Sequence, residues 1–461
     1  MQQKIPGIRY EIGLYSKRIG VFRGLSATIQ QSSHSMLQCI RIGVIQKESA
    51  MKKSILCIGM LLIAAVLFGV GISEQAHFSN PSNAAYLEQY FQIKLPASGL
   101  EAKQFGAALI AITGKPVSLS EPKDIFKALV ESADLSQLAL TYTTEKAGER
   151  LAYYGITETV PADLSRYVAC SLDAHLLPAS TAKDLLGARH VSSETAANLL
   201  MSVANATGIS RNYIGRVSDS DILMRISNAF DGYTLFSDGN LDAIGAMAVQ
   251  KRASTGYNLK KDADDARFLT TRTIQYGHSD ETHLKQLTVL LNSEGIDAKL
   301  QIEPKVSIYE YLLDWGPVPE PSPYYMVLQF SENLYLAYAV EYDAKFEFDT
   351  HEDLLAFDSL INTYAKKNDA NQAKNSNVAL LKGAWWQPLY STTFQADEKA
   401  YQEIVDCVLE ENGYSIHPFS LVETKQNLID TLENLSALEV QERTLYVNNA
   451  FYRYLSGSDY Q

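Results

Sequence analysis

Met326-Val-Leu-Gln-Phe330, Leu334-Tyr-Leu-Ala-Tyr-Ala-Val340 and Ala344-Lys-Phe-Glu-Phe348 are the stretches that decide the fold of the C-terminal half. They are short and rich in the apolar and aromatic residues that favour β-structure. The polar segment Ser331-Glu-Asn333, which separates the first two, is typical of a turn. The sequence therefore predicts three consecutive strands that form a β-meander.

A repeated pattern of helix, turn and strand surrounds this meander. Leu284 to Leu291 carries its leucines on one helical face, Glu294-Gly295 ends that helix, and Ala298 to Ile302 returns as a strand. The same order recurs with a helix at Tyr401 to Leu409 and a strand at Tyr414 to Val422. We therefore expect helices packed on a largely antiparallel sheet.

The expected fold class is α+β, with a helical N-terminal domain followed by a mixed α/β domain with a largely antiparallel sheet. The helical domain spans residues 80–208, where apolar residues recur at helical spacing. The mixed domain spans residues 209–461. Four prolines in residues 317–323 form a stiff connector that would divide this second domain in two.

Three stretches of the helical domain are similar to one another: Leu100 to Leu109, Tyr142 to Leu151, and Val191 to Leu200. The third follows a helix-like piece that ends in Leu176-Leu177-Pro178. This order of helix, Leu-Leu-Pro exit, loop and capped helix resembles the S-layer homology repeat of bacterial surface proteins. The resemblance implies a cell-envelope protein and covers about 110 residues. An unrelated bundle of capped amphipathic helices is the alternative, and the C-terminal part resembles no family.

In S-layer homology repeats, the second helix opens with a Thr-Arg pair whose arginine helps to bind a cell-wall polymer. Ala102, Thr144 and Ser193 stand at the matching positions of this chain. The resemblance therefore implies the fold of the family, whereas weak or no polymer binding is expected.

The segment 51–73 has the order of charges and apolar residues that is typical of a signal peptide. Met51-Lys-Lys53 precedes an uncharged, mostly apolar run from Ile55 to Ile72, and small residues follow, so cleavage is expected after Ser73. The alternative is an uncleaved membrane anchor, because 18 residues are near the lower limit for a membrane span. Residues 1–50 are interpreted as a leader or as the product of a misassigned translation start. The expected location is secreted or associated with the envelope of a bacterium.

The charge of the chain excludes one class of partner. The formal net charge is −13, and without residues 1–73 it is −20, from 31 basic and 51 acidic residues. Such an excess of negative charge disfavours binding to nucleic acid. Contact with a membrane is expected only through residues 55–72, if they are uncleaved. Cys170 and Cys407 remain in the mature part, and two buried thiols are preferred over a disulfide.

One cluster has the residue types of a metal site. His278, Asp280 and His283 lie within six residues, and Glu303 is expected alongside them on the returning strand. Imidazole and carboxylate groups are ligands that zinc and other divalent transition metals prefer. No other cofactor is suggested. The alternative is that Asp280 or Ser279 caps the helix and that both histidines are hydrogen-bonding groups.

Aromatic residues suggest a second kind of site. Trp315, Trp385, Trp386 and Tyr257 stand near loops, glycines or prolines, and their flat rings suit stacking on sugar faces. The alternative is that they are half-buried residues at the edge of the core.

The expected function is a non-catalytic binding role in an exported envelope or secreted protein, with a cell-wall glycan or another envelope protein as partner. One alternative is a metal-dependent hydrolase that uses the cluster at His278. Another is a membrane-anchored structural protein. The chain contains no Gly-x-Ser-x-Gly, phosphate-loop, His-Glu-x-x-His or nucleotide-binding motif, so an enzyme is not favoured.

Overall fold

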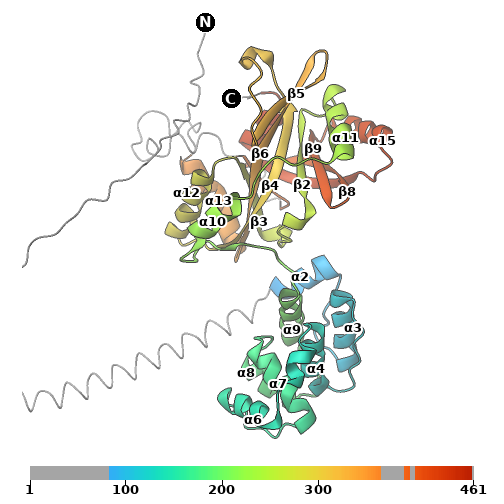
Figure 1. Ribbon diagram of the computed structural model, residues 1–461, viewed down its shortest axis with the longest axis vertical. Coiled ribbons are helices and arrows are strands. Elements are labelled where there is room, and N and C mark those ends of the chain that lie inside the picture. Colours follow the sequence, from blue (N-terminus) through green and yellow to red (C-terminus); the bar gives the residue numbers. More distant parts are fainter. Residues whose placement is uncertain (1–81, 365–388, 395–399, 459–461) are drawn as a thin grey trace, which may run out of the picture. The chain divides into compact units, whose positions relative to one another are not determined.

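The computed structural model describes residues 82–364, 389–394 and 400–458 of the chain (Figure 1). The expected leader at 1–50 and signal peptide at 51–73 lie outside the described residues. None of the described helices is long and apolar enough to span a membrane.

The described N-terminal part of the chain is helical. Its apolar side chains form one core in which Phe105, Leu109 and Leu199 are fully buried. Cys170 lies in this core, and it and Cys407 are buried free thiols. The helices are α2 (Ser82–Phe91), α3 (Ala102–Thr113), α4 (Ile125–Ser132), α5 (Ser136–Leu140), α6 (Thr144–Tyr153), α7 (Ala162–Asp173), α8 (Ala179–Gly187) and α9 (Ser193–Ala206).

The three similar stretches each supply the start of a helix. α3, α6 and α9 begin at Ala102, Thr144 and Ser193, the positions that were matched to the Thr-Arg pair. Leu100 and Val191, which open two of the stretches, form an antiparallel bridge with N–H···O distances of 2.7 and 3.0 Å. The stretches are therefore alike in local structure as well as in sequence.

A closed antiparallel barrel of eight strands follows in the described part of the chain. Its strands are β2 (Gly256–Lys261), β3 (Thr273–His278), β4 (Ala298–Glu310), β6 (Leu334–Phe348), β7 (Leu389–Thr392), β8 (Tyr401–Glu411), β9 (Tyr414–Leu421) and β10 (Gln441–Asn448). Around the barrel the order is β4–β2–β9–β8–β10–β7–β3–β6, and the pairing of β6 with β4 closes the ring. Two further strands lie beside it: β1 (Gly215–Arg216) pairs with β4, and β5 (Tyr325–Ser331) pairs with β6.

The predicted fold class, α+β with a mixed domain on a largely antiparallel sheet, is wrong because the sheet closes into this barrel. Closure depends on β4 and β6, which are 13 and 15 residues long. They pair along their whole length, from Ala298 opposite Phe348 to Glu310 opposite Leu336. Each also offers its second edge to another barrel strand, β2 or β3, so the ring has no free edge.

The barrel is apolar outside and polar inside, because successive side chains of a strand point to opposite faces. On β4, Leu300 and Ile302 belong to a core shared with helices, whereas Lys299, Glu303 and Lys305 are buried on the other face. Covering helices have room only outside an eight-stranded barrel. The charged face is therefore the interior.

Two groups of helices cover the outer face (Figure 1). α10 (Ile222–Phe230), α12 (Glu281–Ser293) and α13 (His351–Tyr364) pack in one core with β3, β4 and β6. α11 (Gly239–Gln250) and α15 (Lys425–Leu435) pack in another with β2, β4, β8 and β9. The last described helix, α16 (Asn449–Leu455), follows β10. This covering explains why the strands are buried on both faces.

Candidate functional site

The predicted metal cluster lies where β3 passes into α12. The Asp280 side chain caps the helix, and its Oδ1 accepts from the backbone N–H groups of Thr282 at 2.7 Å and His283 at 3.2 Å. The ring of His278 lies flat against that of His283, with 3.8 Å between centroids. His283 is buried, and its Nε2 is 2.7 Å from the hydroxyl oxygen of Tyr276. Three of the four predicted ligands are therefore neighbours.

Glu303, the fourth predicted ligand, lies on the interior face of the barrel. His283 is on α12, which packs against the outer face, so the wall of the barrel separates the two side chains. Within the described ranges, no group of three or more His, Cys, Asp or Glu side chains is arranged to hold a metal. Burial lowers the pKa of His278 to about 4, although the nearby charge of Asp280 opposes this shift. His278 is thus neutral at pH 7.

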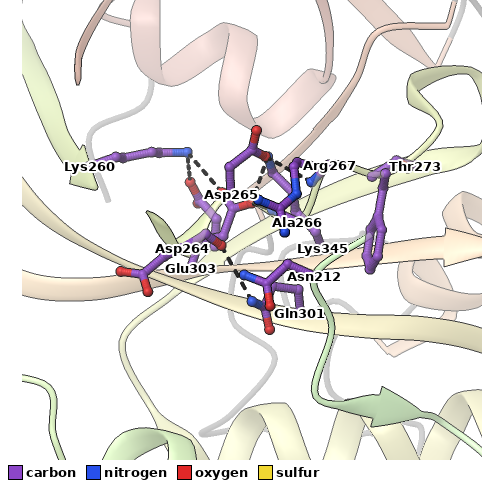
Figure 2. Close-up of polar contacts among 12 residues, drawn as sticks. Asn212, Lys260, Asp264, Asp265, Ala266, Arg267, Thr273, Gln301, Glu303 and Lys345 are labelled. Carbon is purple, nitrogen blue, oxygen red and sulfur yellow. Dashed lines mark hydrogen bonds and ion pairs between the residues drawn. The ribbon is translucent and has the colours of Figure 1, made fainter. Parts of the chain in front are cut away.

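Figure 2 shows that Glu303 belongs to a polar network. Its Oε1 lies 2.8 Å from Lys345 Nζ and accepts the backbone N–H of Ala266 at 2.8 Å. Lys260 Nζ is 3.8 Å from Oε2, and Asp265 is 3.4 Å from Lys345. The carboxylate is therefore fully engaged in ion pairs and a backbone hydrogen bond.

Asp343 extends this network along the interior. Lys260 Nζ is 2.5 Å and Lys305 Nζ is 2.8 Å from its carboxylate oxygens. Burial by itself would raise the pKa of Asp343, but the two ammonium groups outweigh burial and hold that pKa well below its usual range. Asp343 is thus ionised inside the barrel.

The segment that joins β2 to β3 completes the network at one end of the barrel. Its Leu269 N–H donates to Glu347 at 2.6 Å, and Glu347 also pairs with Arg211 at 2.7 Å and Lys299 at 3.0 Å. These buried charges compensate one another, so the removal of one partner would leave the other buried without compensation.

The predicted ligand-binding aromatics lie in different surroundings. Tyr257 is buried, and its hydroxyl donates to the backbone carbonyl of Asp242 at 3.1 Å. Trp315 is 52% exposed, and its ring stands edge-on to that of Tyr311. Trp385 and Trp386 lie outside the described residues. Of the two predicted aromatics that the structure describes, Trp315 is therefore the exposed one.

Trp315 is one of several exposed apolar residues on the loop between β4 and β5 and on β5 itself. Of the 18 exposed large apolar side chains in the described residues, seven lie between residues 312 and 330. We call them the β5 surface: Leu312, Leu313, Trp315, Val318, Tyr324, Leu328 and Phe330. Such a concentration of exposed apolar side chains is typical of an interaction site.

Beside this surface, β5 offers a free strand edge. The N–H of Val340 on β6 donates to the carbonyl of Tyr324 at 2.9 Å, so alternate residues of β5 face β6. The backbone groups of Val327 and Gln329 therefore point away from β6, and no strand of the described chain pairs with them. β5 is thus open to another strand.

Sequence analysis singled out Trp315 but missed the aliphatic members of the β5 surface. The sequence signal for this surface was a set of apolar residues on both sides of the proline-rich stretch 317–323. Leu312, Leu313 and Leu328 have neither helical nor alternating periodicity. We interpreted that stretch as a connector. The structure shows that it joins β4 to β5, which both pair with β6.

No protein family, curated protein or solved structure matches the chain.

Proposed function

We propose that this chain is an exported bacterial protein that binds another envelope protein through the β5 surface. The observation that carries the proposal is the coincidence of exposed apolar side chains with a free strand edge. Export is proposed from the order of charged, apolar and small residues in 51–73. The barrel itself serves as the rigid support.

A protein is favoured over a glycan as the partner. Leu312, Leu313 and Val318 are aliphatic and offer no flat face for stacking on a sugar. The outward backbone groups of the exposed Gln329 can pair with the backbone of another peptide, which is the basis of recognition by strand addition. Alternating side chains of an added strand would then meet Leu328 and its neighbours on the outer part of β5.

The metal-dependent hydrolase is less well supported. Glu303 is held by lysines, the ring of His283 packs on that of His278, and His283 also contacts Tyr276. The membrane-anchored structural protein remains a prediction about residues 55–72, and N-terminal sequencing of the exported protein tests it.

The test is the binding of purified protein to envelopes of the producing cell. We expect the double substitution Leu313→Ser and Trp315→Ser to weaken binding at least tenfold, because buried tryptophans often dominate an interface. Gln329→Pro should also weaken it, since proline removes an outward N–H while the bonds from β5 to β6 remain. The matched control is Val289→Ser with Leu355→Ser, two exposed apolar residues on covering helices.

Envelopes digested with a protease separate the two kinds of partner. We expect digestion to abolish binding, and removal of the wall polysaccharide to leave it unchanged. Full binding to protease-treated envelopes, or equal binding by the wild type and the double variant, would contradict the proposal.

A further inference from the structure

Three buried side chains in the barrel form a chain of hydrogen bonds that the proposed function does not use. Ser415 and His417 are two residues apart on β9 and therefore share its interior face. His417 Nε2 is 3.1 Å from Ser415 Oγ, and His417 Nδ1 is 2.9 Å from Oδ2 of Asp406 on the neighbouring strand β8. Nucleophile, base and carboxylate are in the order of a Ser-His-Asp triad.

A Ser-His-Asp triad requires one direction for each of these bonds. The bond between His417 and Asp406 must be donated by His417 Nδ1, because an ionised carboxylate only accepts hydrogen bonds. The other ring nitrogen of a neutral imidazole then has a free lone pair. That nitrogen can accept the Ser415 Oγ–H, which is the arrangement that a general base needs in order to activate a hydroxyl.

Ser415 lies close to the end of the barrel. It stands two positions after the exposed turn Asn412-Gly413, and it pairs in register with Lys260 of the interior network. Burial raises the pKa of Asp262, an exposed residue at the same end, and a hydrogen bond from Ser415 opposes this shift. Asp262 thus competes with His417 for the serine proton.

We propose that this site hydrolyses small carboxylic esters, with Ser415 as nucleophile, His417 as general base and Asp406 as a positioning residue. Ser415 Oγ bonds to the carbonyl carbon while its proton passes to His417 Nε2. The ester C–O bond then breaks, and the leaving alcohol takes that proton. Water, deprotonated by His417, attacks the acyl-serine and releases the carboxylic acid and free Ser415. This activity is independent of binding through the β5 surface.

The first experiment treats the full-length protein with diisopropyl fluorophosphate. Attack by Ser415 forms an O–P bond and expels fluoride, so we expect one adduct per chain, located on Ser415 by peptide mass spectrometry. The folded wild type should also hydrolyse p-nitrophenyl acetate with a burst of about one equivalent. Absence of the adduct from the folded wild type would overturn the proposal without the use of any variant.

Variants separate catalysis from accidental labelling. Ser415→Ala should lose the adduct, and Ser420→Ala, a buried serine on the opposite face of β9, should keep it. Asp406→Asn should slow labelling by about 10³-fold or more at an unchanged melting temperature, and Asp406→Glu should restore part of the rate. Asp262→Asn should label at least as fast as the wild type. Equal labelling rates in Asp406→Asn and the wild type would show an ordinary serine and refute the triad.

Discussion

At the scale of single residues, His278 shows how burial changes the pKa of a side chain. Its ring packs flat on that of His283, and its Nδ1 accepts the backbone N–H of Asp280 at 2.9 Å. Both contacts suit the neutral imidazole, and a proton on Nδ1 would break the second. Both histidines of the pair thus make hydrogen bonds, His278 to the backbone of Asp280 and His283 to Tyr276.

We expect His278 to make the protein less stable in mild acid. Its pKa is about 4 when folded, against 6.5 in the unfolded chain, so only the unfolded chain takes up a proton as the pH falls between these values. The free energy of unfolding should thus drop by up to about 3 kcal/mol from pH 7 to pH 4. Urea unfolding across this range measures the drop.

His278→Asn is the matched variant, because its side-chain oxygen can still accept from Asp280. Part of the pH dependence should disappear in this variant, while stability at pH 7 changes little. An identical pH dependence in the two proteins would mean that His278 does not titrate as its burial requires.

At the scale of elements, the contacts of Asp280 are those of a helix cap. It holds two N–H groups in the first turn of α12. We expect Asp280→Ala to lower the free energy of unfolding by about 1–2 kcal/mol, and Asp280→Asn by only a few tenths, since asparagine also caps helices. Both are measured by urea unfolding. Zinc bound stoichiometrically by the wild type and lost in Asp280→Asn would contradict this structural role.

The sequence predicted some elements well and others poorly. The helix at Leu284 to Leu291 and the strand at Ala298 to Ile302 are confirmed by α12 and β4. Tyr401 to Leu409 is wrong as a helix: it is strand β8. Its apolar residues fit helical spacing because both faces of the strand are buried, which removes the alternation that identifies a strand.

The predicted meander failed for a related reason. Its second and third strands are one strand, β6. Glu341 and Asp343 interrupt the apolar pattern like a turn, yet both point into the polar interior of the barrel, where lysines pair with them. Barrel closure was equally hidden, since it depends on pairings such as β2 with β9 that no local pattern records. Of the candidate site, Trp315 was predicted, whereas Leu328 and the strand edge require the fold.

At the scale of the whole molecule, the helical domain can be tested apart from the barrel. We expect a fragment of residues 80–208 to be helical by circular dichroism, because its core is built mainly from its own helices. It should sediment with purified cell walls no more than an unrelated acidic protein does, since Ala102, Thr144 and Ser193 lack the expected basic group. Retention comparable to that of an intact S-layer homology domain would contradict this expectation.

The way in which the barrel closes has a consequence for its biogenesis. β2 pairs with β9 through residues that are more than 150 positions apart, from Lys261 with Tyr414 to Tyr257 with Pro418. Such high contact order makes folding slow, because long loops must close before the native contacts form. The barrel cannot be completed until β9 and then β10, which pairs with β8 and β7, have left the ribosome. A nascent chain that stays unfolded for this long is in the state needed to be threaded through a narrow secretion channel.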